Sequence, residues 1–161
     1  MKPTLIRPIL KKDNAQIAAV IRSVLEELES TEAGTTYTDA ILDNLYEYYQ
    51  QPRASFYVVE LKGRVLGGGG VSKLSNYEGN VCELQKMYFL PTLRGLGFGK
   101  KILKRCIADA TTFGYHQMYL ETLSRMFAAQ ELYKKHGFDY IDGPLGDTGH
   151  FYCGVRMLKD L

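Results

Sequence analysis

The segment LPTLRGLGFGKKIL, residues 90–103, limits what this chain can fold into more than any other stretch. Gly95, Gly97 and Gly99 alternate there with larger residues, between an apolar run typical of a buried strand and an amphipathic run typical of a helix. Glycines at such a junction let another molecule approach the backbone amides, which are unpaired in the first turn of a helix. The segment therefore predicts a strand-to-helix turn that contacts a ligand.

Composition predicts one globular domain and argues against several classes of partner. The 161 residues are 45% hydrophobic and 24% charged with a net charge of +2, so we expect a single domain over residues 1–161 and no nucleic-acid partner. No apolar run has the length of a membrane span, and the N-terminus lacks the features of a signal peptide. We therefore expect a cytoplasmic protein with no membrane partner, and a homodimer stays open as its oligomeric state.

The three cysteines, Cys82, Cys106 and Cys153, form no CxxC pair and are odd in number. This argues against a disulfide framework and against a zinc site. We therefore expect no metal and three reduced, buried thiols.

Apolar periodicity predicts the order of the helices and strands. Helical spacing indicates helices near residues 13–29 and 38–50, one of about fifteen residues that stops at Gly114, and a short one before Gly137. Strand-like runs cover residues 4–10, 55–61, 64–74, 81–90, 117–123, 138–141 and 150–158. The sum predicts an α/β (α+β) fold, with a single mixed, mostly antiparallel sheet of about seven strands and helices on both faces.

Two details of this pattern decide how the middle of the chain is interpreted. Lys62-Gly63 has the length and the glycine of a tight hairpin turn between two strands. The GGGG run, residues 67–70, lies close to Val65, Leu66 and Val71, which favours a strand with a bare surface over a flexible linker.

Three phosphate-binding motifs compete for the glycine segment. A P-loop fails because Arg94 and Lys101 stand where it needs glycine and a hydroxyl residue. A dinucleotide fingerprint fails because it needs glycine at Lys100 or Ile102, although Glu121 stands where a ribose-binding acid is expected. The dinucleotide reading is kept as an alternative, and the pattern Q/R-x-x-G-x-G/A remains.

That pattern is met by Arg94, Gly97 and Gly99, and here the sequence resembles the GNAT superfamily of acetyl-CoA-dependent N-acetyltransferases. CELQKMYFLPTLRGLGFGKKIL is similar to the superfamily's fourth strand, pyrophosphate loop and third helix, and YLETLSRMFAAQELYKKHGF to its fifth strand and fourth helix. The resemblance implies acetyl-CoA as co-substrate. Its contacts are then Met87, Tyr88 and Phe89 for the pantetheine, and Arg94, Gly95, Leu96, Gly97, Phe98, Gly99 and Lys100 for the pyrophosphate.

Simple electrostatics supports an anion at this turn. A helix N-terminus carries about half a positive charge, and Arg94 adds a cation beside it. Lys100 and Lys101 in the first helical turn oppose the helix dipole, which is easier to understand if a diphosphate occupies the site.

Acetyl transfer to an amine needs a base for the ammonium ion and an acid for the leaving thiolate. Glu83 lies in an otherwise apolar strand, where burial would raise its pKa, and it matches the position of the general base in histone-acetylating members. Tyr133 falls on the tyrosine of the superfamily's LY…GF pattern and is the proposed acid. Met126 replaces an asparagine that contacts coenzyme A in many members, which leaves Arg125 or Ser124 as substitutes.

The acceptor is less constrained. The resemblance implies an acceptor site between the tyrosine-rich segment after the first helix and the loop before the last strand, where Thr148 and His150 could bind or deprotonate an amine. We expect direct transfer to a primary amine of a small molecule through a ternary complex. A protein N-terminus or lysine is the alternative acceptor, and a non-catalytic acetyl-CoA-binding module is a third possibility.

Overall fold

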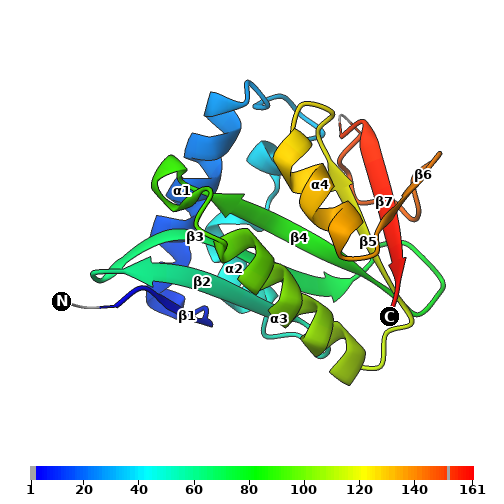
Figure 1. Cartoon of the computed structure of the whole chain (residues 1–161), viewed down its shortest axis with the longest axis horizontal. Helices are drawn as coiled ribbons and strands as arrows, with labels where there is room; N and C mark the ends of the chain where they lie inside the picture. The colour runs from blue at the N-terminus through cyan, green and yellow to red at the C-terminus, as the bar shows by residue number, and fades with distance from the viewer. Residues whose placement is uncertain (1–2, 152) are drawn as a thin grey trace.

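The computed structural model describes residues 3–151 and 153–161. Within them the chain forms one sheet of seven strands in the order β1-β2-β3-β4-β5-β7-β6 (Figure 1). The strands are β1 Leu5–Pro8, β2 Ser55–Leu61, β3 Arg64–Lys73, β4 Val81–Phe89, β5 Gln117–Thr122, β6 Asp139–Ile141 and β7 Val155–Asp160. Only β4 and β5 pair in parallel, and every other neighbouring pair is antiparallel. The predicted mixed, mostly antiparallel sheet is confirmed.

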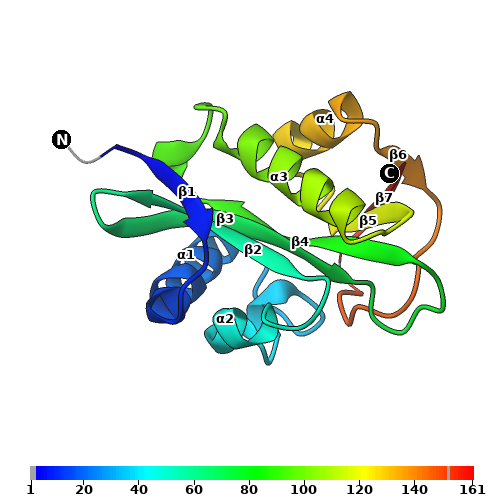
Figure 2. The ribbon, with the colours of Figure 1, turned by 90° about the horizontal axis from the view of Figure 1, so that it is seen from below.

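Helices cover both faces of this sheet, as the sequence predicts. They are α1 Asn14–Glu27, α2 Leu45–Tyr48, α3 Phe98–Thr112 and α4 Phe127–Lys135. Figure 2 shows α1 and α2 on one face and α3 and α4 on the other. A hydrophobic core lies on each face of the sheet, and the side chains of β2 point alternately into the two. Phe56 and Val58 pack with α1 and α2, whereas Val59 packs with α3. No helix of the described residues is long and apolar enough to cross a membrane.

Two predicted elements are shorter than their sequence patterns indicate. The helix predicted over residues 38–50 is reduced to a 3-10 turn, Leu42–Asn44, followed by the four-residue α2. Asn44 has φ −133° and ψ 40°, which interrupts the helix so that Leu42 and Leu45 can both be buried beneath α1. The strand predicted from residue 150 begins only at Val155, because His150 lies in a loop with its side chain bound elsewhere.

The glycine run, residues 67–70, lies within strand β3, as predicted. Close neighbours leave no room for side chains at two of these positions. An added Cβ at Gly68 would lie 2.6 Å from the Tyr57 carbonyl oxygen, and one at Gly70 would lie 2.5 Å from that of Ser55. The Lys62-Gly63 turn that precedes β3 has positive φ at both residues, 53° and 81°, as a tight hairpin turn requires. The three cysteines are buried and free, in agreement with the sequence.

A bulge in β4 changes which side chains face each layer. The register of β3 with β4 shifts between Gly68 and Gly70, and Lys86 has a φ of 53°. An extra residue in a strand reverses the alternation of side chains beyond it. Met87 therefore packs in the α3 core, while Tyr88 packs on the side of α1 and α2.

The pairing of β4 with β5 is brief. It covers three residue pairs, from Val81 with Gln117 to Glu83 with Tyr119. Beyond Glu83 the two strands no longer pair, and α4 follows β5 along the chain (Figure 1). The sheet therefore opens at the C-terminal half of β4.

Candidate active site

A cleft of about 490 Å³ lies where the sheet opens, between β4, the glycine segment and α4. It is lined by nine of the ten residues predicted to bind acetyl-CoA, together with Tyr133. The lining residues among those predicted are Met87, Tyr88, Phe89, Arg94, Gly95, Gly97, Phe98, Gly99 and Lys100. The tenth, Leu96, does not line the cleft, and 63% of the residue is exposed.

The N-terminus of α3 faces this cleft without a protein cap. Gly97 is the residue before the helix and has a φ of 86°, a conformation that glycine adopts freely. The first intrahelical bond runs from the Lys101 N–H to the Gly97 carbonyl at 3.2 Å, and no acidic residue lies in the first turn. Phe98, Gly99 and Lys100 therefore offer amides with no partner inside the helix, which suits a diphosphate.

Arg94 lies at the mouth of the cleft but is already engaged. Its Nε donates to the Phe89 carbonyl at 3.0 Å, and its NH1 contacts the Glu27 carboxylate of α1 at 2.5 Å. Both side chains of this ion pair are well exposed. The cation predicted for the pyrophosphate thus bridges the loop to α1.

The end of β4 presents backbone amides to the cleft. The Leu90 N–H donates to the Leu66 carbonyl of β3 at 2.9 Å, so the N–H of Phe89 must point away from β3. The β5 side of β4 carries no strand at this level, because the pairing ends at Glu83. The N–H of Phe89 therefore faces the open side of β4, where β5 does not pair with it.

Tyr133 places a free hydroxyl in the cleft. The residue is 5% exposed and its ring packs edge-on against Phe138, with centroids 5.8 Å apart. None of the described residues hydrogen-bonds its hydroxyl. Burial raises the pKa of Tyr133, so the phenol stays protonated at neutral pH and keeps a proton to donate.

Glu83 lies in a second, smaller cavity of about 40 Å³ on the side of the sheet that α1 and α2 cover. The residue is 4% exposed, and the Gln85 amide donates to its Oε1 at 2.7 Å. Burial is the main reason that the pKa of Glu83 is raised to about 7, and the charge of Glu121 adds to it. Tyr88 and Met126 line both cavities, so the carboxylate lies in a space next to the cleft.

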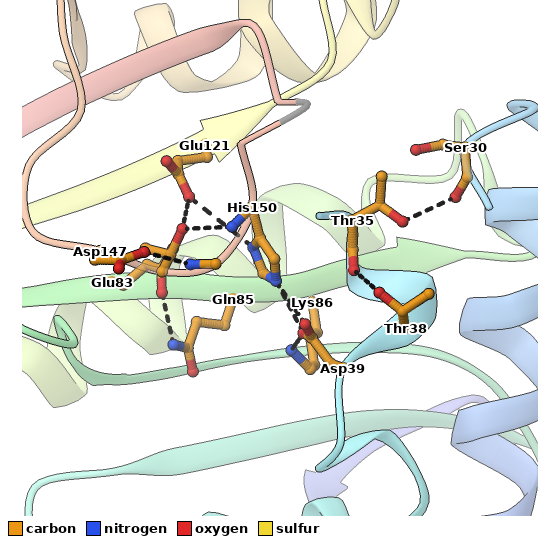
Figure 3. A network of polar contacts seen from close by, with 12 residues as sticks. Ser30, Thr35, Thr38, Asp39, Glu83, Gln85, Lys86, Glu121, Asp147 and His150 are labelled. Atoms are coloured by element: carbon orange, nitrogen blue, oxygen red, sulfur yellow. Dashed lines mark hydrogen bonds and ion pairs between the residues drawn. The ribbon is translucent and has the colours of Figure 1, made fainter. Parts of the chain in front are cut away.

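A polar network surrounds this second cavity (Figure 3). Both carboxylate oxygens of Asp39 contact Nε2 of His150, at 2.8 and 2.9 Å, and Lys86 contacts the same carboxylate at 2.6 Å. Burial acts to lower the pKa of His150, but the hydrogen bond and charge of Asp39 outweigh it and the pKa is raised. Burial likewise opposes the charge of Asp39, yet its bond to His150 and the charge of Lys86 lower its pKa.

Glu121 forms the third side of the network. It accepts hydrogen bonds from Tyr119 and from Thr148, and its Oε1 lies 3.9 Å from Nδ1 of His150. Arg156 approaches its other oxygen at 3.9 Å. No sequence pattern marks Asp39, Lys86 or Gln85 as site residues, and the sequence suggests Glu121 only as a ribose ligand.

Glu83, Glu121 and His150 each offer a ligand atom, and these atoms lie within 4.8 Å of one another. Such a set resembles a metal site in its residue types. Its carboxylates are bonded to neutral donors, Gln85 and Thr148, and His150 to Asp39, so we describe it as a hydrogen-bond network.

The position that departs from the superfamily pattern lies between the two cavities. Met126 precedes α4, and the Thr122 hydroxyl contacts its sulfur at 3.4 Å. Of the two proposed substitutes for the usual asparagine, Arg125 lines the large cleft, while the Ser124 carbonyl accepts a bond from Gln130.

The model of the acetyltransferase (GNAT) family matches residues 22–138. The chain belongs to the GNAT family. The N-acetyltransferase YjgM of Escherichia coli (strain K12) is 45% identical over 157 residues, which cover 97% of this chain and 94% of YjgM. GNAT membership and this relative make the chain an N-acetyltransferase.

Solved GNAT structures share the fold over the whole length. An acetyltransferase of the GNAT family from Staphylococcus aureus Mu50 has a TM-score of 0.83 and 21% identity, with 99% of both chains covered. The structure of yncA from Salmonella typhimurium contains its cofactor acetyl-CoA. It has a TM-score of 0.76 and 26% identity, and covers 99% of this chain and 95% of that one.

Proposed function

We propose that this GNAT protein transfers the acetyl group of acetyl-CoA directly to a primary amine of a small molecule. The observation that carries the proposal is the pair of adjoining cavities, one with the buried Glu83 and the other with the unpaired hydroxyl of Tyr133. An amine beside Glu83 and a thioester beside Tyr133 would meet where Tyr88 and Met126 line both spaces.

In the proposed reaction one proton transfer takes place in each of the two cavities. Glu83 takes a proton from the ammonium ion, and the free amine attacks the thioester carbon to form the C–N bond. As the C–S bond breaks, the electron pair leaves with sulfur, which takes a proton from Tyr133. The nitrogen loses two protons in all and sulfur gains one, so one proton is released to solvent.

Acetyl-CoA would be held by groups that the cleft already presents. Its pyrophosphate would receive the amides of Phe98, Gly99 and Lys100 at the start of α3. Its pantetheine would run along the open side of β4, where the Phe89 amide faces away from β3. Arg94 would exchange its contact with Glu27 for a phosphate oxygen.

The size of the second cavity favours a small acceptor over a protein chain. It has a volume of about 40 Å³ and lies between the segment that carries Asp39 and the loop that carries His150. The side chains of Asp39 and His150 contact each other and so join the two segments across the cavity. A peptide would need an open groove at this point, so a small molecule is the better fit.

Direct transfer is favoured over an acetyl-cysteine intermediate. Cys153 is the cysteine that lines the acceptor cavity, and burial raises its pKa to about 12. A thiol that remains protonated at neutral pH is a poor nucleophile. The three free, buried cysteines are also consistent with a reducing compartment, and we propose that the protein acts in the cytoplasm as a single domain.

A thiol-release screen with acetyl-CoA tests the proposal. The acceptors are amino acids, polyamines, aminoglycosides and peptides with a free N-terminus or lysine, and Glu83→Gln serves as the inactive comparison. We expect release with a small amine. Release with peptides alone would favour the protein-modifying alternative. No release with any amine, from a protein whose melting temperature rises with acetyl-CoA, would indicate a non-catalytic binding module.

A further inference from the structure

Three side chains converge on the second cavity with atoms that can accept hydrogen bonds. Glu83, Glu121 and His150, here called the amine-binding triad, come from β4, β5 and the loop before β7. Their ligand atoms lie within 4.8 Å of one another around a common space. Figure 3 shows Glu83, Glu121 and His150 converging from these separate elements.

Each member keeps an acceptor available for a ligand. Asp39 occupies Nε2 of His150 with both oxygens, so Nε2 carries the hydrogen. Above the raised pKa of His150 the ring is neutral and Nδ1 has a lone pair. Oε2 of Glu83 accepts no hydrogen bond from the described residues, although the residue is 96% buried and lines the cavity. Glu121 Oε1 accepts only the Thr148 hydroxyl as a hydrogen bond and faces Nδ1.

The spacing separates two kinds of ligand. Around an ammonium ion, acceptors at about 2.8 Å in tetrahedral directions lie about 4.6 Å apart. Ligands of a divalent metal at about 2.1 Å lie only about 3.0–3.4 Å apart. The 3.9 Å between His150 Nδ1 and Glu121 Oε1 is too wide for metal ligands and needs only a small opening for an ammonium ion.

The charges around the triad agree with a bound cation. Glu83 and Glu121 are acidic, while Lys86 is turned towards Asp39 and Arg156 lies on the far oxygen of Glu121. The groups that face His150 are Asp39, Lys86, Glu83 and Glu121. Lys86 is therefore paired with Asp39, whereas Nε of Arg156 has no hydrogen-bond partner among the described residues and approaches only Oε2 of Glu121. The space between Glu83, Oε1 of Glu121 and Nδ1 of His150 is lined by acceptors.

We propose that the amine-binding triad binds the acceptor as its ammonium ion, with one N–H directed to each of Glu83, Glu121 and His150. This proposal rests on the proposed function and adds Glu121 and His150 as the residues that select a protonated primary amine over secondary and quaternary amines. A secondary amine has one N–H too few for the triad, and a quaternary ammonium has none. Asp39 is a positioning residue, because it fixes the His150 ring so that Nδ1 faces the cavity.

Binding can be tested without any turnover. The probes are methylammonium and tetramethylammonium chloride at equal ionic strength, added to the protein saturated with coenzyme A. The readout is the imidazole NMR signals of the three histidines, with those of His150 assigned from a His150→Gln variant. We expect methylammonium to shift the His150 signals in a saturable way and tetramethylammonium to leave them unchanged. Equal responses to both cations, or a response to neither, would overturn the proposal.

Variants locate the site. In Glu121→Gln the carboxylate charge is lost but the shape is kept, and we expect the methylammonium response to weaken by about 10- to 100-fold. Glu78→Gln, an exposed residue in the turn before β4, is the matched control and should respond like the wild type. If Glu121→Gln unfolds, His150→Asn replaces it, with methylammonium binding followed by calorimetry. A zinc titration that occupies the triad more tightly than methylammonium does would replace the ammonium site with a metal site.

Activity distinguishes this proposal from the one on which it rests. With any amine found in the thiol-release screen, we expect the N-methyl derivative to be a much poorer acceptor, and Glu121→Gln to raise KM for the amine more than it lowers kcat. Release with primary and secondary amines alike would refute the triad and leave the acetyltransferase function in place. A specific methylammonium response without thiol release from any amine would support the triad and refute the acetyltransferase function.

Discussion

Replacing Glu83 by glutamine should stabilise the protein considerably more at pH 8 than at pH 5. The pKa of this carboxyl is raised from an ordinary value of 4.5 to about 7, mainly by burial. Between pH 4.5 and pH 7 the folded state holds a proton that the unfolded state releases, so the free energy of unfolding falls as the pH rises. Above pH 7 the folded protein carries the whole cost of a buried charge.

The expected magnitude follows from that pKa. One pKa unit corresponds to about 1.4 kcal/mol, so a rise from 4.5 to about 7 corresponds to about 3 kcal/mol at pH 8. Glutamine keeps the shape and the acceptor for the Gln85 amide, but its own buried amide reduces the gain. We expect a net stabilisation of about 1–3 kcal/mol at pH 8, or roughly 3–10 °C in melting temperature.

Urea unfolding of wild type and Glu83→Gln at pH 5 and pH 8 measures this difference, with Glu78→Gln as an exposed control. The same variant should lose acetyl transfer at neutral pH and recover part of it as rising pH supplies neutral amine. If the difference in unfolding free energy between wild type and variant were the same at both pH values, the Glu83 carboxylate would not be desolvated. The physical basis for its role as a base near neutral pH would then be lost.

Further outcomes follow from other contacts of the site. Tyr133→Phe should lower kcat by about 10²–10⁴-fold with little change in the KM for acetyl-CoA, as measured by thiol release, whereas a purely structural hydroxyl would leave kcat unchanged. Glu27→Gln frees Arg94 from its ion pair and should lower the Kd for coenzyme A about two- to five-fold in calorimetry; a weaker complex would contradict this. Lys86→Met should cost up to about 3 kcal/mol in urea unfolding, because Asp39 loses a buried partner, and Asp39→Asn in the same chain should restore part of it.

The parts of the fold that depend on local patterns could be predicted from the sequence. Strand and helix periodicity is a property of neighbouring residues, and so are the Lys62-Gly63 turn and the glycine segment before α3. The helix expected over residues 38–50 is not continuous, because Leu42 and Leu45 reach the α1 core only if the chain turns at Asn44. Tertiary packing decides there against the local preference.

The candidate site was predictable only on its cofactor side. Glu83 is conspicuous as an acid in an apolar strand, and the glycine pattern identifies the cleft. Asp39, in contrast, lies 111 residues before His150, and nothing in its neighbourhood marks it as the partner of that histidine. Lys86 contacts the same carboxylate from the bulge of β4, and no sequence pattern predicts that bulge.

The glycine run of β3 has a consequence for sequence variation. Alanine at Gly68 or Gly70 would press a methyl group against the backbone of β2 and the ring of Phe56, and overpacking of this kind typically costs about 1–3 kcal/mol. In a library of all single substitutions, this low-complexity stretch should therefore tolerate fewer replacements than the reactive side chains, whose loss leaves the fold intact. A survey of variants by abundance alone would rank the run among the most restricted positions, and a survey by activity would add the reactive groups to it.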